Sequence, residues 1–231
     1  MKLLSLNEEA PREYYIFMNP GNDFLGKILK HNFGLNHIMS SSGFQYFTIH
    51  PQEYINGEVQ YLPFIKNDAK NMNPIPSPFV LRAIQNYSLE YNLEIFRSTY
   101  YPKFPSRLGA IYAFGDLATC VQVAQKHGWP LQEIKKFKIY DAKPEYIQFM
   151  RIVKCNMNIV SYLRGMLWEP LGVDFQNQMF DNYWHCKDAV IFDKETNRTT
   201  EVGIIGEYLI DGILELTELS DDDKKLLGEL S

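Results

Sequence analysis

The stretch Phe104-Pro-Ser-Arg-Leu-Gly-Ala-Ile-Tyr-Ala-Phe114 is the part of the sequence that decides the fold. Pro102 and Pro105 stiffen the approach to its arginine, and the apolar run 111–114 predicts a short strand. We expect such an arginine to lie at a sheet edge, where its planar group can bind a phosphate or carboxylate through two parallel hydrogen bonds. Arg107 is therefore either an anion-binding residue or an ordinary arginine of the surface or of a structural ion pair.

The composition is that of a folded protein with a sizeable core. Of 231 residues, 45% are hydrophobic and 14% aromatic, which suffices for one large domain or two small ones. No apolar run is long enough to span a membrane, and the start, Met1-Lys-Leu-Leu-Ser-Leu-Asn-Glu-Glu9, becomes acidic too soon for a signal peptide. Three cysteines without a CxxC pair or a Cys/His cluster indicate reduced thiols. We therefore expect a cytoplasmic protein with no membrane segment and no metal.

Charge is unevenly distributed along the chain. The formal net charge is −5, which argues against a general polyanion-binding protein. Residues 103–154 nevertheless hold nine Lys or Arg against four Asp or Glu, whereas residues 155–231 hold six against fifteen. A basic centre in an acidic protein fits a local site for an anionic ligand better than a long nucleic-acid track, although a solvated helix face would explain the lysines equally well.

The hydrophobic pattern predicts an α+β fold rich in antiparallel strands. Strands are expected at 13–18, 93–97, 111–114, 134–140 and 190–192, with one or two closing strands within 201–216. Helices are expected at 23–30, 79–91, 117–127, 144–155 and 156–167, and near 181–184. Residues 33–78 are expected to form an irregular insertion with strand-like pieces at 44–49 and 59–64, and 218–231 to form a terminal helix or tail. Because there is no repeat and no clear linker, we expect 1–231 to be a single domain.

Four motifs in series resemble those of a family of bacterial and phage proteins in the ADP-ribosyltransferase superfamily. They are the Phe104–Phe114 stretch, Asn156-Met-Asn-Ile-Val160, Tyr183-Trp184 and Gly206-Glu-Tyr-Leu-Ile-Asp-Gly-Ile-Leu214. The resemblance covers roughly residues 93–216. It implies a split, strongly curved sheet that holds NAD in a central cleft. It also implies transfer of ADP-ribose from NAD to a protein side chain, a nucleic acid or a small molecule.

The resemblance also implies roles for particular residues. Glu207 corresponds to the catalytic glutamate, and Arg107 to the residue that holds the NAD phosphates or orients the nicotinamide ribose. Tyr112 is a candidate aromatic wall for nicotinamide. Apart from the resemblance, Arg97 lies ten residues before Arg107 on the predicted preceding strand and is a second candidate for the pyrophosphate or an acceptor phosphate. Tyr15 lies near the place where many members carry a His or Arg that fixes the NAD ribose.

The chain departs from the family pattern at several positions. The first-strand His or Arg is missing, which puts the hold on NAD near Tyr15 in question. Asn156 stands where members often have an acidic residue, and His185-Cys186-Lys187 follows the Tyr-Trp pair where members have a glycine. These departures fit a changed acceptor or a lost activity. Glu201 is the alternative to Glu207 as catalytic glutamate.

The chemistry explains why a carboxylate is needed. Cleavage of the nicotinamide glycosidic bond passes through a positively charged ribose, as in glycoside hydrolysis, which a nearby carboxylate stabilises. The leading hypothesis is an NAD-dependent ADP-ribosyltransferase, for example a toxin or phage-conflict effector, with NAD as substrate, no metal and a nucleic acid or protein as acceptor. A toxin of this kind would have a neutralising protein partner. The alternatives are an inactive binding protein with the same fold and an NAD glycohydrolase, in which water replaces the acceptor.

Overall fold

The structure is a computed structural model that describes residues 3–4, 9–18, 37–40, 78–142, 147–166, 172–193 and 197–230. At Met39, 78–86 and 229–230 it describes the backbone alone. The helix predicted at 23–30 and the strand-like pieces predicted at 44–49 and 59–64 lie outside these residues. Within the described ranges, no helix is both long and apolar enough to cross a membrane.

The elements alternate irregularly along the chain. The helices are α4 (Pro78–Tyr100), α5 (Leu117–His127), α7 (Met157–Gly165), α8 (Val173–Trp184) and α9 (Asp221–Leu230), with a 3₁₀ turn at Leu131–Glu133. The strands are β1 (Glu13–Phe17), β2 (His37–Met39), β3 (Ile111–Ala113), β4 (Ile134–Ile139), β5 (Arg151–Asn156), β6 (Val190–Asp193), β7 (Arg198–Glu201), β8 (Gly206–Asp211) and β9 (Ile213–Thr217).

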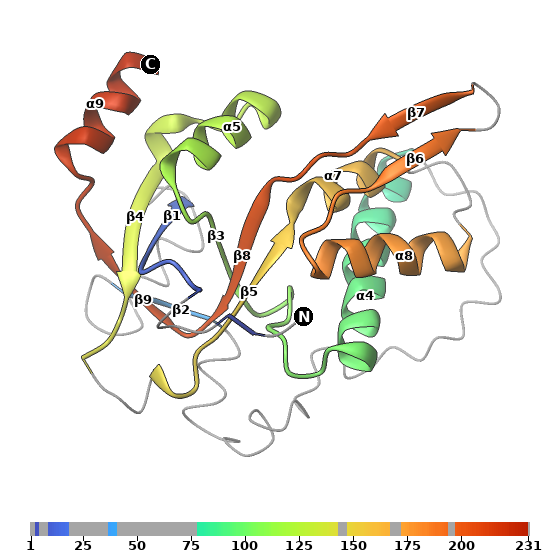
Figure 1. Cartoon of the computed structure of the whole chain (residues 1–231), viewed down its shortest axis with the longest axis horizontal. Coiled ribbons are helices and arrows are strands. Elements are labelled where there is room, and N and C mark those ends of the chain that lie inside the picture. The colour runs from blue at the N-terminus through green and yellow to red at the C-terminus, as the bar shows by residue number, and fades with distance from the viewer. Residues whose placement is uncertain are drawn as a thin grey trace.

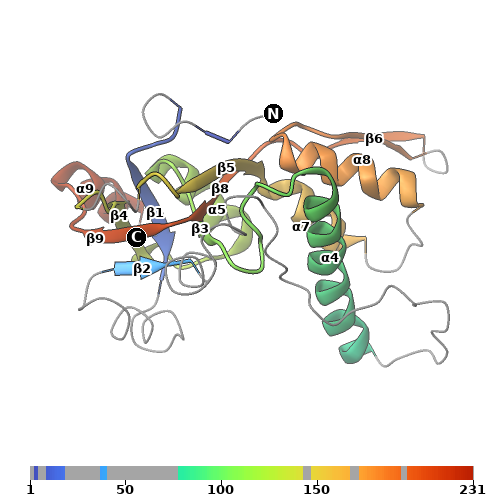
Figure 2. The same cartoon turned by 90° about the horizontal axis from the view of Figure 1, so that it is seen from below.

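All strand pairs in the described residues are antiparallel. One sheet has the order β1-β4-β9-β2, a second has the order β3-β8-β5, and β6 pairs with β7. Figure 1 and Figure 2 show the first sheet and α9 at one end of the molecule and α4, α7 and α8 at the other, with β3, β8 and β5 between them. The predicted α+β class with antiparallel sheets is confirmed.

The two larger sheets are joined by one nearly continuous segment. Only Gly212 separates β8 from β9, yet β8 pairs with β3 and β5 whereas β9 pairs with β4 and β2. A Cβ at Gly212 would lie 2.7 Å from Cε of Met150, so glycine allows this close approach. A second link is made by Tyr15 and Phe114, which exchange two backbone hydrogen bonds of 2.8 Å between β1 and the residue that follows β3.

The alternation of side chains along β8 decides what its two faces contact. Tyr208 and Ile210 enter the core between the two larger sheets. Leu209 points the other way, into the core that α4, α7 and α8 form with the second sheet. Because Glu207 lies two residues before Leu209, it shares that face and is directed toward the three helices. Only 5% of Glu207 is exposed.

The strand predicted at 93–97 is wrong, because these residues belong to α4. Only Leu93, Glu94 and Ile95 alternate between apolar and polar side chains, and the adjacent apolar pair Ile95-Phe96 breaks the period of a strand. In the helix, Leu93 and Phe96 lie three residues apart and both enter the core. Glu94 and Arg97 form an ion pair of 2.7 Å across one turn. Both contacts require helical spacing, and Arg97 therefore lies on a helix.

The short helix predicted at 144–155 is also wrong over residues 151–155. These residues form β5, which pairs with β8 from Arg151, opposite Asp211, to Asn156, opposite Gly206. Ile152 faces the core between the sheets and Val153 faces the helices. Both faces of this strand are thus covered, which hides the alternating pattern that sequence reasoning relies on.

Most other predicted elements are confirmed. The strands at 13–18, 111–114, 134–140 and 190–192 and the helices at 117–127 and 156–167 are present within a few residues. Asp116 caps α5 by accepting a 2.7 Å hydrogen bond from the Thr119 amide. The terminal helix begins after Ser220, which exchanges two hydrogen bonds of 3.1 Å with Asp223. Within the predicted irregular insertion, His37–Met39 forms β2.

The end of α8 has the geometry of a Schellman motif without its usual glycine. The Cys186 amide donates to the Tyr183 carbonyl (3.1 Å) and the Lys187 amide to the Asn182 carbonyl (2.9 Å). Cys186 has a φ of 50°, the left-handed conformation that glycine adopts at no cost. Cys186 is one of the three residues that follow the Tyr183-Trp184 pair.

We expect the substitution Cys186→Gly to raise the free energy of unfolding by about 1 kcal/mol, because it removes the steric cost of a left-handed residue. Urea denaturation measures this change. Asn197→Gly is the matched control, since Asn197 has a φ of 55° but asparagine tolerates that region better, so its gain is smaller. A loss of stability in Cys186→Gly would show that strain at this position is outweighed by the contacts of the thiol.

Candidate functional site

Arg107 lies in the loop between α4 and β3, and β3 is an edge strand of its sheet. Arg97 holds this loop, because its Nη1 donates to the backbone oxygens of Pro102 (2.9 Å) and Phe104 (3.0 Å). Ser106 adds a hydrogen bond of 2.8 Å from its hydroxyl to a Glu94 carboxylate oxygen. Arg107 thus lies in the loop that leads into an edge strand, but its guanidinium contacts Glu207 on the central strand β8, and only 6% of the residue is exposed.

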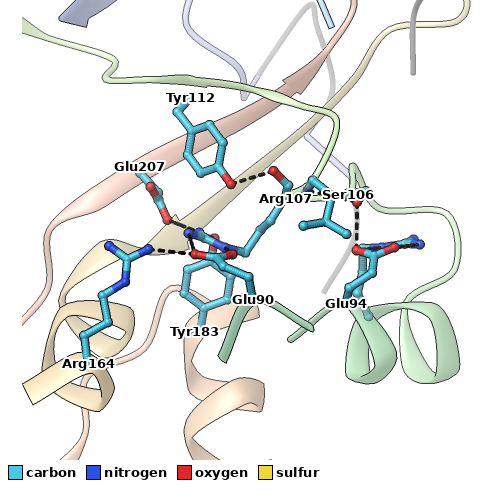
Figure 3. Close-up of polar contacts among 10 residues, drawn as sticks. Glu90, Glu94, Ser106, Arg107, Tyr112, Arg164, Tyr183 and Glu207 are labelled. Atoms are coloured by element: carbon cyan, nitrogen blue, oxygen red, sulfur yellow. Dashed lines mark hydrogen bonds and ion pairs between the residues drawn. The ribbon is translucent and has the colours of Figure 1, made fainter. Parts of the chain in front are cut away.

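The guanidinium of Arg107 binds two carboxylates from different elements (Figure 3). Its Nε and Nη2 donate to Oε2 and Oε1 of Glu90 on α4, at 2.7 and 2.9 Å. Its Nη1 donates to Oε1 of Glu207 on β8 at 2.8 Å and to the hydroxyl of Tyr183 on α8. Arg107 thus connects its own loop to α4, α8 and β8.

Tyr183 completes the buried part of the site. It is fully buried, and its hydroxyl donates a hydrogen bond of 2.9 Å to Oε1 of Glu207. Cys155 lies opposite Glu207 in the β5–β8 pair and is also fully buried. Burial, followed by the negative charge of Glu207, raises the pKa of the Cys155 thiol well above its usual value. Cys155 is therefore a neutral thiol and no candidate nucleophile.

Three partly exposed residues surround this buried group (Figure 3). Tyr112 is 38% exposed, but its hydroxyl turns inward and donates to the Arg107 carbonyl at 2.6 Å. The Arg107 Cζ lies 5.0 Å from the centre of the Tyr112 ring, within cation–π range. Arg164 on α7 donates to Oε1 of Glu90 at 2.7 Å. The side chains of Glu90 and Arg164 are 20% and 46% exposed, so solvent reaches the cluster from this side.

The charges of the cluster balance. Two arginines, Arg107 and Arg164, face two glutamates, Glu90 and Glu207. Burial works against ionisation of Glu90, but the hydrogen bonds and charge of Arg107, with the charge of Arg164, outweigh it and hold the pKa of Glu90 below its ordinary value. A buried arginine needs this neutralisation, because an unpaired charge in the interior is strongly unfavourable.

Three of the predicted site residues therefore come together and two do not. Arg107, Glu207 and Tyr112 lie in one cluster. Arg97 is fully buried on α4, about two helical turns after Glu90, and holds the 101–104 backbone. Tyr15 lies on β1, where its hydroxyl donates to the Asp223 carboxylate at 3.2 Å and so fixes α9.

The alternative glutamate is placed elsewhere. Glu201 lies on β7, all of whose residues are exposed, and is paired with Val190 across the β6–β7 ribbon. Sequence reasoning missed Glu90 and Arg164 as members of the cluster. The one signal for Glu90 is that it lies four residues before Glu94, so that on a helix the two side chains share one face. The incorrect strand prediction for 93–97 concealed this spacing.

Asn156 is fully buried and occupies the N-cap of α7. Its Oδ1 accepts from the amides of Asn158 and Ile205, each at 3.1 Å. Its Nδ2 donates to the carbonyls of Lys187 and Gly203, each at 2.8 Å. This residue joins β5, α7, the end of α8 and the approach to β8. A carboxylate could supply only the accepting half of this network.

We expect Asn156→Asp to lower the free energy of unfolding by about 3 kcal/mol, because two buried carbonyls would lose their donor and face a carboxylate. Thermal and urea unfolding at neutral pH measure the loss. Asn182→Asp on α8, a half-buried asparagine, is the control and should change stability far less. A variant Asn156→Asp as stable as the parent protein would mean that the amide donors are not needed.

Among the described residues, no group of three or more His, Cys, Asp and Glu side chains is arranged to hold a metal ion. Comparison of the sequence with models of known protein families finds no match, and neither does comparison with curated proteins.

Proposed function

We propose that the protein is an NAD-dependent ADP-ribosyltransferase that modifies a macromolecular acceptor, either a nucleic acid or a protein. The observation that carries this proposal is the contact between Arg107 and Glu207, which lie 100 residues apart in the sequence. Tyr183 is hydrogen-bonded to both. These three residues belong to three of the four motifs that resemble the ADP-ribosyltransferase superfamily, and the fold brings them to one place.

The proposed reaction exchanges one bond at the ribose carbon of NAD. The bond to the nicotinamide nitrogen breaks, and its electron pair leaves with nicotinamide. An oxygen or nitrogen of the acceptor bonds to the same carbon and gives up its proton to a base. Positive charge develops on the ribose in between, so a carboxylate held nearby lowers the barrier.

Glu207 is suited to this role by its surroundings. It is buried, so its charge acts through a medium of low dielectric constant and is less screened than at the surface. Arg107 and Tyr183 fix its orientation before any substrate arrives. In this proposal Arg107 also binds a phosphate of NAD, and the exposed ring of Tyr112 provides a surface for nicotinamide.

A second candidate function is binding without catalysis. The observation that favours it is that each of the three guanidinium nitrogens of Arg107 already has a protein partner. In this second function Arg107 keeps all of these contacts and only stabilises the fold, which would leave the basic residues 103–154 as a contact surface. Nicotinamide release separates the two functions, and free ADP-ribose as the product would indicate hydrolysis instead of transfer.

The test is release of nicotinamide from NAD by the purified protein, alone and with added RNA, DNA or cell protein. We expect Glu207→Gln to slow release by about 10² to 10³-fold, the range seen when one preorganised electrostatic contact is removed. The amide oxygen of the substituted side chain still accepts hydrogen bonds from Arg107 and Tyr183, so the fold is expected to persist. The additive that stimulates release identifies the class of acceptor.

Glu201→Gln is the matched control, since it removes the same charge from an exposed residue of β7. It is expected to leave release unchanged. Equal rates for Glu207→Gln and the parent protein would contradict the role of Glu207. Absence of release in every mixture would favour the binding function.

A further inference from the structure

Glu90 bridges the two arginines of the cluster. Its two carboxylate oxygens receive the Nε and Nη2 of Arg107, at 2.7 and 2.9 Å, and its Oε1 is shared with Nη2 of Arg164, at 2.7 Å. Two parallel hydrogen bonds from one guanidinium, with a second guanidinium on the same anion, are also the arrangement by which arginines bind a phosphate. The carboxylate thus stands where an anionic ligand would be held.

The neighbouring ion pair on α4 provides a comparison, because it is a glutamate–arginine contact that only stabilises the fold. Glu94 and Arg97 make the same two-point contact, at 2.7 and 3.0 Å, one helical turn after Glu90. Both of their side chains are 2% exposed, and Arg97 also holds the backbone of the next loop. By contrast, Glu90 is 20% exposed and Arg164 46% exposed. A ligand can therefore reach Glu90 and Arg164 but not Glu94 and Arg97.

We propose that Arg107 and Arg164 form a subsite for a phosphate group of a nucleotide, and that Glu90 occupies it until the phosphate displaces its carboxylate. This inference rests on the proposed function and adds to it the residues that would receive the diphosphate of NAD. Displacement leaves Arg107 paired with Glu207, so the buried glutamate keeps its position while the exposed one moves toward solvent. No covalent step is involved.

The displaced carboxylate has a predictable effect on affinity. A ligand that must first break the contacts of Glu90 binds more weakly than one that meets a free subsite. Its apparent dissociation constant equals the constant for the free subsite divided by the fraction of molecules in which the subsite is open. Removing the charge of Glu90 should therefore strengthen the binding of a phosphate ligand, whereas a purely structural Glu90 would give unchanged or weaker binding. Arg164 should act in the opposite direction.

The experiment is titration calorimetry of the full chain with ADP-ribose and with inorganic pyrophosphate. We expect Glu90→Gln to bind both about tenfold more tightly and Arg164→Gln about tenfold more weakly, the change that one charge-assisted contact produces. Glu201→Gln on the exposed β7 is the charge-matched control and is expected to match the parent protein. Circular dichroism establishes that each variant is folded.

The inference is overturned if Glu90→Gln binds these ligands no more tightly than the parent protein, or if Arg164→Gln binds them equally well. It is likewise overturned if no variant binds either ligand. Because binding is measured without turnover, the outcome is separate from that of the proposed function. If the affinities change as expected but no nicotinamide is released, the phosphate subsite is supported and the proposed enzymatic activity is contradicted. If nicotinamide is released but the affinities do not change as expected, the activity is supported and the subsite is contradicted.

Discussion

The buried charge of Arg107 is the constraint on which the candidate site depends. A guanidinium that is 6% exposed must be paired, and here it is paired by Glu90 from one side and Glu207 from another. Glu90 comes from α4 and Glu207 from β8, so the ion pairs fix a helix and a strand around one loop. Tyr183 ties α8 to the same point. The pairing that stabilises this region is therefore also what preorganises the proposed catalytic carboxylate.

The position of Glu207 follows from the way the two larger sheets are joined. β8 continues into β9 through Gly212, so the same segment belongs to both sheets and is fixed along its length. The alternation of β8 then directs Glu207 and Leu209 to the helices and Tyr208 to the core between the sheets. Asn156 secures the other end of the region by linking the starts of α7 and β8.

Sequence reasoning located the strand that follows Arg107, the late strand of Glu207 and the helix end at Trp184, because each has a clear pattern and a clear boundary. It ended α4 near Tyr91, because the short run 93–95 fits a strand or a helix equally well. The helix shows only in pairs three residues apart, Leu93 with Phe96 in the core and Glu94 with Arg97 in an ion pair. It missed Arg164 for a different reason. The partner of an exposed arginine is set by how helices pack, and no local pattern records that Arg164 on α7 meets Glu90 on α4.

The most direct test of the central claim is a double-mutant cycle on nicotinamide release from NAD, with Arg107→Lys, Glu207→Gln and the two combined. If the ion pair acts as a unit, the double variant should be no slower than Glu207→Gln alone, because residues that work together lose their effect together. Losses that multiply would show two independent roles. A parent protein that releases no nicotinamide under any condition would contradict the proposal itself.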